Sequence, residues 1–470
     1  MSTETMFLRS AMAAGGSQVG RAAIRLVTDL TLARLIVPEG HGLFALAWSI
    51  VIVAGLVRDQ GLPYEVVRDP GRRFGSVLLW ELFSGVTVTL VLMLGAGWLS
   101  GVDPDLPRVL RVLALWVLLE GLSVVPRVWF ERELRVDAVV VPEIGRGALM
   151  AATAITLAAL GFGVWSLVIG ELVASAAYAA ALWVRAWGRM QLDLDPASIP
   201  ELLRSSYLLF LIALLANAPP LIARFLVEGF EGTAMVGQFE KAHLWAMRAQ
   251  MLIVPALARA VYPTFVTYRL DRDRLIGAYH LGTLAICSAE ILAAYLIFWN
   301  AEFLVLEVLM GSQWQDAVPL IRILSLLPLV DPISRLGGEM LKTVREDRTF
   351  LAIIAINVTC LAAFGWWLGR RMGAEGVAWA HFLALGHGIM AWRIYRIRGP
   401  SLFRLVRDLS VAYLLPLPLL GIVAWVYPSG SWERLAASAV VLLVVGGVVA
   451  MRFYRPFRTF FFGTTETPGS

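Results

Sequence analysis

The chain has 470 residues, of which 59% are hydrophobic and only 16% are charged, with a formal net charge of +5. A soluble domain is usually about a quarter charged and closer to half apolar, so these proportions exclude a large soluble protein. Apolar runs of the length that crosses ~30 Å of hydrocarbon recur along the whole chain. The sequence therefore predicts an all-α polytopic membrane protein.

Hydropathy predicts about fourteen membrane spans. Their approximate cores are residues 14–36, 43–57, 74–99, 109–126, 138–160, 164–187, 206–227, 234–262, 275–299, 317–341, 350–369, 375–393, 409–427 and 434–451. Between the first two spans, Pro38, Gly40 and Gly42 predict a tight turn that breaks the helix at the membrane surface. Arg34 lies about one helical turn from that surface, where its side chain reaches water.

The connecting segments predict the orientation. With a cytoplasmic N-terminus and alternating spans, Lys and Arg favour the cytoplasmic side by roughly 25 to 5. The main exception is the pair Arg370 and Arg371. We therefore expect an even number of spans and both termini in the cytoplasm. The excess positive charge then reflects orientation and contact with membrane lipids, and indicates no nucleic-acid partner.

A weak internal repeat of about 190 residues predicts the domain organisation. The sequence ARLIV at 33–37 resembles ARFLV at 223–227, and GVW at 163–165 resembles GVAW at 376–379. Both halves begin in the cytoplasm, so the repeats are expected to be parallel. The predicted parts are an N-lobe of spans one to six (1–190), a cytoplasmic linker (191–205), a C-lobe of spans seven to twelve (206–398), and spans thirteen and fourteen with a cytoplasmic tail (399–470).

Arginines inside predicted spans are the first group of candidate site residues, because a charge at membrane depth is costly. Arg21, Arg25 and Asp29 recur every four residues in span one and share one helical face. Arg25 and Asp29 alternatively form an ion pair within the helix. Arg58 ends span two, where an anchor at the cytoplasmic surface is the alternative. Arg248 lies centrally in span eight with no acidic residue within a turn, and a salt bridge to another helix is the alternative.

Carboxylates inside spans are the second group. Glu81, Glu120 and Glu290 have no partner at helical spacing in the sequence. These three and Asp29 are candidates for coupling to H+ or Na+, with a structural role as the alternative.

No metal site, cofactor or enzymatic activity is expected. Cys287 and Cys360 lie in apolar runs without ligand spacing, and His381 and His387 are six residues apart, which is a poor metal spacing. No nucleotide-binding loop, metalloprotease motif or nucleophile elbow is present.

Several segments resemble the Wzx-type polysaccharide flippases, a branch of the multidrug/oligosaccharidyl-lipid/polysaccharide exporter superfamily. They are LARLIVPEGHGLFALA (32–47), GLVRDQGL (55–62), GFGVWSLVIG (161–170) and GAEGVAWA (373–380). The resemblance covers roughly residues 10–395. Most of the matching residues are turn and packing positions, which report the fold and subfamily better than the substrate.

The resemblance implies two six-helix lobes in a V whose central cavity opens to one side at a time. The implied substrate is an undecaprenyl-diphosphate-linked oligosaccharide, which crosses the bacterial inner membrane for exopolysaccharide, capsule or O-antigen synthesis, with a polymerase and export proteins as partners. In lipid II flippases of this superfamily, arginines of spans one, two and eight line the cavity. The matching residues are Arg21 or Arg25, Arg58 and Arg248, whose planar guanidinium groups suit a diphosphate.

Three other functions remain open at this point. A drug/cation antiporter of the same fold would have a cavity dominated by carboxylates. A membrane polymerase or ligase would need a long external loop, which the sequence lacks. An inactive scaffold in an export complex is the third.

Overall fold

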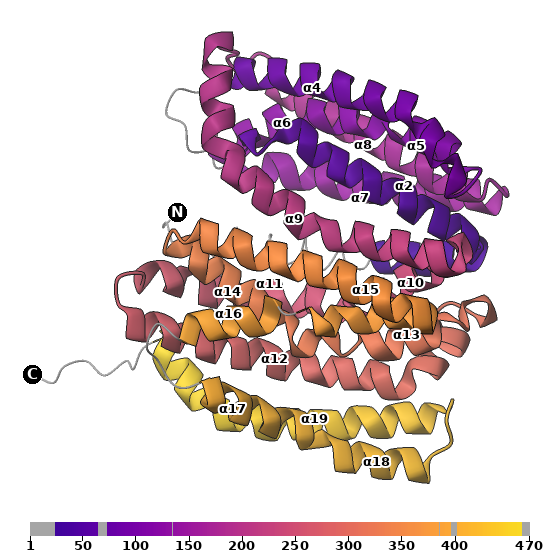
Figure 1. The fold of residues 1–470 in the computed structure, drawn as a ribbon, viewed down its shortest axis with the longest axis vertical. Helices are drawn as coiled ribbons and strands as arrows, with labels where there is room; N and C mark the ends of the chain where they lie inside the picture. The colour runs from indigo at the N-terminus through magenta and orange to yellow at the C-terminus, as the bar shows by residue number, and fades with distance from the viewer. Residues whose placement is uncertain (1–23, 64–72, 134, 385, 396–401, 463–470) are drawn as a thin grey trace, which may run out of the picture. The chain divides into compact units, whose positions relative to one another are not determined.

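The computed structural model describes residues 24–63, 73–133, 135–384, 386–395 and 402–462, and all regular structure in these ranges is helical. This confirms the predicted all-α class (Figure 1). The chain divides into two compact units, Met1–Gly237 and Gln238–Ser470, which we describe separately as unit 1 and unit 2.

Unit 1 begins with a helix over residues 24–35. Its other elements are α2 (Pro38–Asp59), α4 (Phe74–Gly95), the 3-10 helix η1 (Ala96–Gly101), α5 (Leu106–Leu113), α6 (Leu115–Arg132), α7 (Val136–Ala159), α8 (Val164–Ala186), the 3-10 turn η2 (Pro196–Ser198), α9 (Ile199–Glu231) and the start of α10 (Thr233–Ala246).

Unit 2 contains the rest of α10 and the remaining helices. They are α11 (Arg248–Thr267), α12 (Arg272–Phe303), the π-helix η3 (Leu304–Leu309), η4 (Ser312–Trp314), α13 (Ala317–Leu324), η5 (Leu327–Leu329), α14 (Asp331–Thr343), α15 (Asp347–Leu383), α16 (Gly386–Tyr395), α17 (Leu402–Leu414), α18 (Pro416–Val426) and α19 (Trp432–Phe462).

Within the described residues, nine helices are long and apolar enough to cross a membrane, or ten if the bent pair 317–329 and 331–343 forms one span. This confirms a polytopic membrane protein. The number is smaller than the fourteen predicted spans. The predicted first span begins outside the described residues, and the predicted eighth span is divided between α10 and α11, of 14 and 20 residues.

A reversal of the chain inside α15 matters for the span count. Gly373 has φ 58° and ψ −137°, which lies outside the helical region and suits glycine. A Cβ added to Gly376 would lie 2.4 Å from the carbonyl oxygen of Leu368, eight residues earlier. In a continuous helix these residues are about 12 Å apart along the axis, so the chain turns back at Gly373. The two arms correspond to the separate spans 350–369 and 375–393 that hydropathy predicts.

The turn after the first helix differs from its prediction. α2 begins at Pro38, whose fixed φ and missing N–H suit the first helical turn, so only residues 36 and 37 are non-helical. Gly40 and Gly42 lie inside α2 and do not break it. Gly42 instead permits close contact, because an added Cβ would lie 1.9 Å from the carbonyl oxygen of Thr233. The prediction that these glycines end the helix is therefore wrong.

The predicted linker 191–205 is bound to unit 1. Ser76 Oγ donates to the carbonyl oxygen of Asp195, and Arg73 forms an ion pair of 3.2 Å with Glu201. Farther along α9, Ser206 donates to the carbonyl oxygen of Gln60. The division into compact units therefore falls at Gly237, after α9, whereas the predicted lobe boundary is the linker itself.

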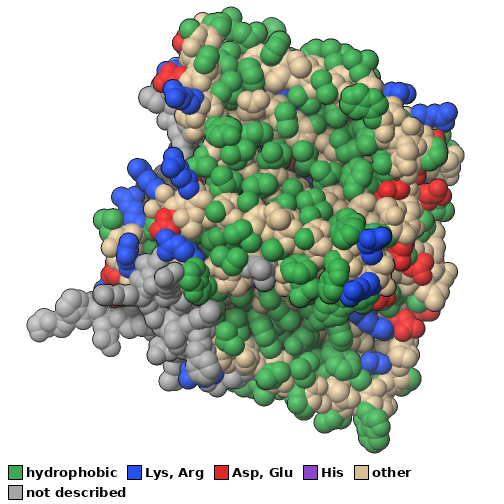
Figure 2. All heavy atoms as spheres, in the orientation of Figure 1, with side chains coloured by type: hydrophobic (Ala, Val, Ile, Leu, Met, Phe, Trp, Pro, Cys, Tyr) green, Lys and Arg blue, Asp and Glu red, His purple; other side chains and the backbone are tan. Residues whose placement is uncertain are grey.

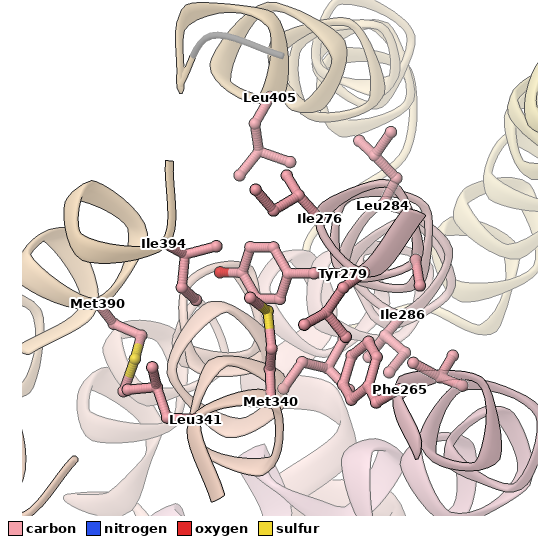
Figure 3. Close-up of a cluster of buried hydrophobic side chains, with 14 of the residues drawn as sticks. Phe265, Ile276, Tyr279, Leu284, Ile286, Met340, Leu341, Met390, Ile394 and Leu405 are labelled. Atoms are coloured by element: carbon pink, nitrogen blue, oxygen red, sulfur yellow. The ribbon is translucent and has the colours of Figure 1, made fainter. Parts of the chain in front are cut away.

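Each unit has its own apolar interior. In unit 2, side chains from α11, α12, α14, α16 and α17 meet around Tyr279, whose hydroxyl donates to the carbonyl oxygen of Ile333 (Figure 3). Many large apolar side chains also face outward, among them Leu94, Trp98 and Trp425. On the face that Figure 2 draws, hydrophobic side chains dominate and charged side chains gather toward two opposite edges, which is the pattern of a surface in contact with lipid.

Gly42→Ala is expected to destabilise the protein by about 1–3 kcal/mol, because the added methyl group overlaps the Thr233 carbonyl and forces α2 and α10 apart. Thermal unfolding of the purified protein in detergent measures this change. Gly147→Ala is the matched control, since nothing lies within 4 Å of its Cβ position in α7. Equal unfolding temperatures for the two variants would contradict the close contact.

Candidate functional site

Arg58, a predicted phosphate ligand, is buried in unit 1. It lies in the last turn of α2 with only 2% of its side chain exposed. Its Nε is 2.8 Å from Glu81 Oε2 on α4, and its guanidinium also pairs with Asp59. Nη1 donates to the carbonyl oxygen of Val117 at 2.7 Å. The arginine therefore joins α2 to α4 and α6 with its charge balanced.

Two glycines make room for the Arg58 side chain. A Cβ at Gly121 would lie 3.2 Å from Arg58 Cδ, and a Cβ at Gly85 would lie 3.6 Å from the same atom. Trp80 and Ser84 donate side-chain hydrogen bonds to the Arg58 carbonyl oxygen, which satisfies an acceptor at the helix end. The residues around Arg58 thus leave space for its side chain and satisfy its backbone carbonyl. Its role toward a substrate stays a prediction.

A second charged cluster in unit 1 contains Glu120 and supplies its ion-pair partner. Arg146 on α7 lies 2.9 Å from Glu120 on α6 and 2.7 Å from Glu171 on α8. Its guanidinium also donates to Ser175 and lies 5.4 Å from the centre of the Tyr178 ring. One arginine therefore ties three helices together. The sequence contains these residues, but their separations in the chain hide the pairing.

The arginines of predicted span one are only partly described. Arg21 lies outside the described residues. Arg25 is exposed within the helix over residues 24–35, and Asp29, one turn later, is half-buried. An exposed guanidinium in the middle of a predicted span is costly unless it meets water or a polar ligand.

Arg248, the other predicted phosphate ligand, belongs to unit 2 and is the first residue of α11. It follows a slight break at Met247, across which hydrogen bonds from Met247 to His243 and from Met251 to Met247 continue the helix. The Arg248 guanidinium lies 4.9 Å from the centre of the Trp245 ring. This cation–π contact fixes the direction of the side chain.

Glu290 differs from Glu81 and Glu120 because it forms no ion pair among the described residues. It lies on α12 with none of its surface exposed, and neither carboxylate oxygen has a hydrogen-bond partner among the described residues. The charged groups that act on it are Asp331 and Arg335 of α14, which form an i,i+4 ion pair at 2.8 Å. Asp331 also accepts a hydrogen bond from Gln250 of α11.

The histidines serve as structural hydrogen-bond partners. His387 lies 2.7 Å from Ser334 Oγ, and His381 bonds to the carbonyl oxygen of Val377 one turn earlier. In the part of the chain that the structure describes, no group of three or more His, Cys, Asp or Glu side chains is placed to hold a metal ion.

Arg58→Met is expected to lower stability by about 3–5 kcal/mol, because it leaves Glu81 buried without its counter-charge. The double variant Arg58→Met/Glu81→Gln should recover part of this loss. Thermal unfolding in detergent of the single and double variants measures the coupling. If Arg58→Met unfolds at the wild-type temperature and still abolishes activity, Arg58 acts on the substrate and not on the fold.

Comparison with known proteins agrees with this architecture. A family model described as "Polysaccharide biosynthesis protein" matches residues 31–319. The succinoglycan biosynthesis transport protein ExoT of Rhizobium meliloti is 25% identical over 66% of this chain, and the match spans 64% of that relative's length. The lipopolysaccharide biosynthesis protein WzxC of Escherichia coli is 22% identical over 84% of this chain and 82% of its own.

Solved structures of transporters share the fold. An inward closed lipid II flippase, MurJ, has a TM-score of 0.75 at 12% identity, with 95% of this chain and 98% of that chain covered. An inward-facing multidrug resistance transporter of the MATE family has a TM-score of 0.61 at 15% identity, with 83% and 99% covered. The expectations of a transporter fold and of a chain that is not an enzyme are confirmed. This multi-pass membrane protein belongs to the polysaccharide biosynthesis protein family, as the resemblance to Wzx-type flippases indicates.

Proposed function

We propose that the protein translocates an undecaprenyl-diphosphate-linked oligosaccharide across the bacterial inner membrane for the synthesis of an exopolysaccharide, capsule or O-antigen. The observation that carries this proposal is the family match over residues 31–319. The names of two relatives, a succinoglycan transport protein and a lipopolysaccharide biosynthesis protein, support a glycan as cargo. The fold that the chain shares with a lipid II flippase supports a lipid diphosphate as carrier.

The architecture that goes with this function has fourteen spans, with both termini in the cytoplasm. Spans one to six and seven to twelve form two lobes in a V, and two further spans follow at the C-terminus. Alternating access of these lobes exposes one cavity to each leaflet in turn. The reversal at Gly373 supports counting residues 347–394 as two of the fourteen spans.

Arg248 and Arg25 are the strongest proposed ligands for the diphosphate. Arg248 is held against Trp245 by a cation–π contact, so little side-chain freedom remains to be lost when an anion binds. Arg25 is exposed at mid-span, where a phosphate would compensate its charge. Arg58 carries less weight, because its guanidinium already faces Glu81 and Asp59. Arg21 is proposed on the sequence alone.

A drug/cation antiporter is the second candidate function, favoured by the shared fold with a multidrug transporter. Its cavity would need carboxylates that face the substrate. Glu81 and Glu120 are instead paired with Arg58 and Arg146, which argues against this alternative.

Arg248→Ala is expected to reduce surface polysaccharide by about tenfold or more, because a hydrogen bond to a charged group contributes about 1.5–3 kcal/mol. The variant and the wild type are expressed in a strain that lacks the gene. Surface polymer and lipid-linked oligosaccharide in the inner leaflet are measured together at equal membrane abundance. We expect the lipid-linked sugar to accumulate inside as the polymer falls.

Arg269→Ala is the matched control, because this substitution removes the same charge from unit 2. Arg269 is exposed just after α11. Full activity of Arg248→Ala would show that Arg248 is structural. A deletion that changes neither polymer nor lipid-linked sugar, and sensitises cells to cationic drugs, would favour the antiporter.

A further inference from the structure

Glu290 is the exception among the intramembrane carboxylates proposed for coupling. Glu81 lies against Arg58, and Glu120 lies against Arg146. Glu290 has no ion pair or hydrogen bond among the described residues, and its exposed fraction is 0%. Placing a carboxylate anion in such surroundings is very costly, whereas the neutral acid is far cheaper to bury.

We propose that Glu290 is a proton-binding site, protonated in this conformation and deprotonated when unit 2 admits water during the transport cycle. The inference rests on the proposed flippase function for its role in coupling. The proton forms an O–H bond to one carboxylate oxygen and later leaves from the same atom, so no other reactant is needed.

The helices around Glu290 contain a break that suits such a site. The span formed by α13, η5 and α14 bends by 41°, and Val330 at the bend has φ −119° and ψ −29°. The bend frees the carbonyl oxygen of Leu329, which accepts from Tyr413 Oη of α17 at 2.6 Å and lies 3.9 Å from Cys287 Sγ of α12. Cys287 is three residues before Glu290, so the break faces the same part of α12.

The polar groups around Glu290 also offer a route to water. Asp331 begins α14 directly after the break, and 31% of its side chain is exposed. It acts electrostatically on Glu290 together with Arg335. Tyr413 and Cys287 are the other titratable groups close by, and both lie against the Leu329 carbonyl oxygen. We expect the proton to reach Glu290 by way of Asp331, which is partly exposed and acts on it.

A proton fits the site better than a metal cation does. A cation held by Glu290 would need further oxygen ligands. The nearby Leu329 carbonyl already accepts from Tyr413, and Asp331 is engaged by Gln250 and Arg335. The neighbouring residues Ile291 and Cys287 of α12 each lie in a buried apolar cluster.

Infrared spectra of the full-length protein in liposomes, compared between wild type and variant, test the protonation of Glu290 directly. We expect the carbonyl-stretch band of a protonated carboxylic acid in the wild type and its loss in Glu290→Gln, which keeps the shape of the side chain. Glu302→Gln is the matched control, because Glu302 lies on the same helix with 55% of its side chain exposed. An unchanged band in Glu290→Gln would overturn the proposal, whatever the protein transports.

Complementation of the deletion strain tests the role in coupling. Glu290→Gln mimics a permanently protonated site, so we expect surface polysaccharide to fall by about tenfold or more at equal membrane abundance, since the cycle loses its second state. Glu290→Asp keeps the titratable group and should restore part of the polymer. If wild type restores polymer and Glu290→Gln does so equally, the coupling role is wrong while the flippase stands.

A separate binding measurement on the purified protein distinguishes sodium from a proton. Binding of radioactive sodium to the purified wild type that disappears in Glu290→Gln would assign the site to Na+ and overturn the proton. The same low sodium binding in both proteins, together with loss of the infrared band in the variant, supports the proton.

Discussion

Hydrocarbon offers no hydrogen bonds, and this constraint governs how the chain places its charges. Two arginines among the described residues of unit 1 pair with carboxylates from other helices. Arg58 is held by Glu81 and Asp59, and Arg146 is held by Glu120 and Glu171. Glycines and backbone carbonyls complete the surroundings of Arg58. The packing of α2, α4, α6, α7 and α8 is therefore set by these cations as well as by apolar contact.

The same constraint makes a carboxylate without a counter-charge informative. A buried acid that is neutral needs no arginine, so Glu290 can lie between apolar clusters of unit 2 where Glu81 could not lie without Arg58. The nearest charges, Asp331 and Arg335, form their own ion pair at a helix break. Whether an intramembrane glutamate has a structural or a titratable role thus depends on whether it has an ion-pair partner.

Hydropathy in the sequence predicts the all-α class and the separate spans 350–369 and 375–393, because these depend on residues close in the chain. Pairings such as Arg146 with Glu171 depend on which helices become neighbours. Residues close in the chain do not determine that. Gly42 illustrates the same limit. The sequence around Gly42 predicts a turn, whereas in α2 this glycine allows the backbone at Thr233 to approach closely.

The ion pairs also restrict how the proposed transport cycle proceeds. Breaking a pair such as Arg58–Glu81 inside the membrane would leave Glu81 buried without its counter-charge, at a cost of about 3–5 kcal/mol. A conformational change is cheaper if it keeps the pairs within each unit and bends the chain where backbone hydrogen bonds are already interrupted. The bend at Val330 is such a place, and it adjoins Asp331 and Glu290. Protonation of Glu290 would then act at a position where the helix is already able to move.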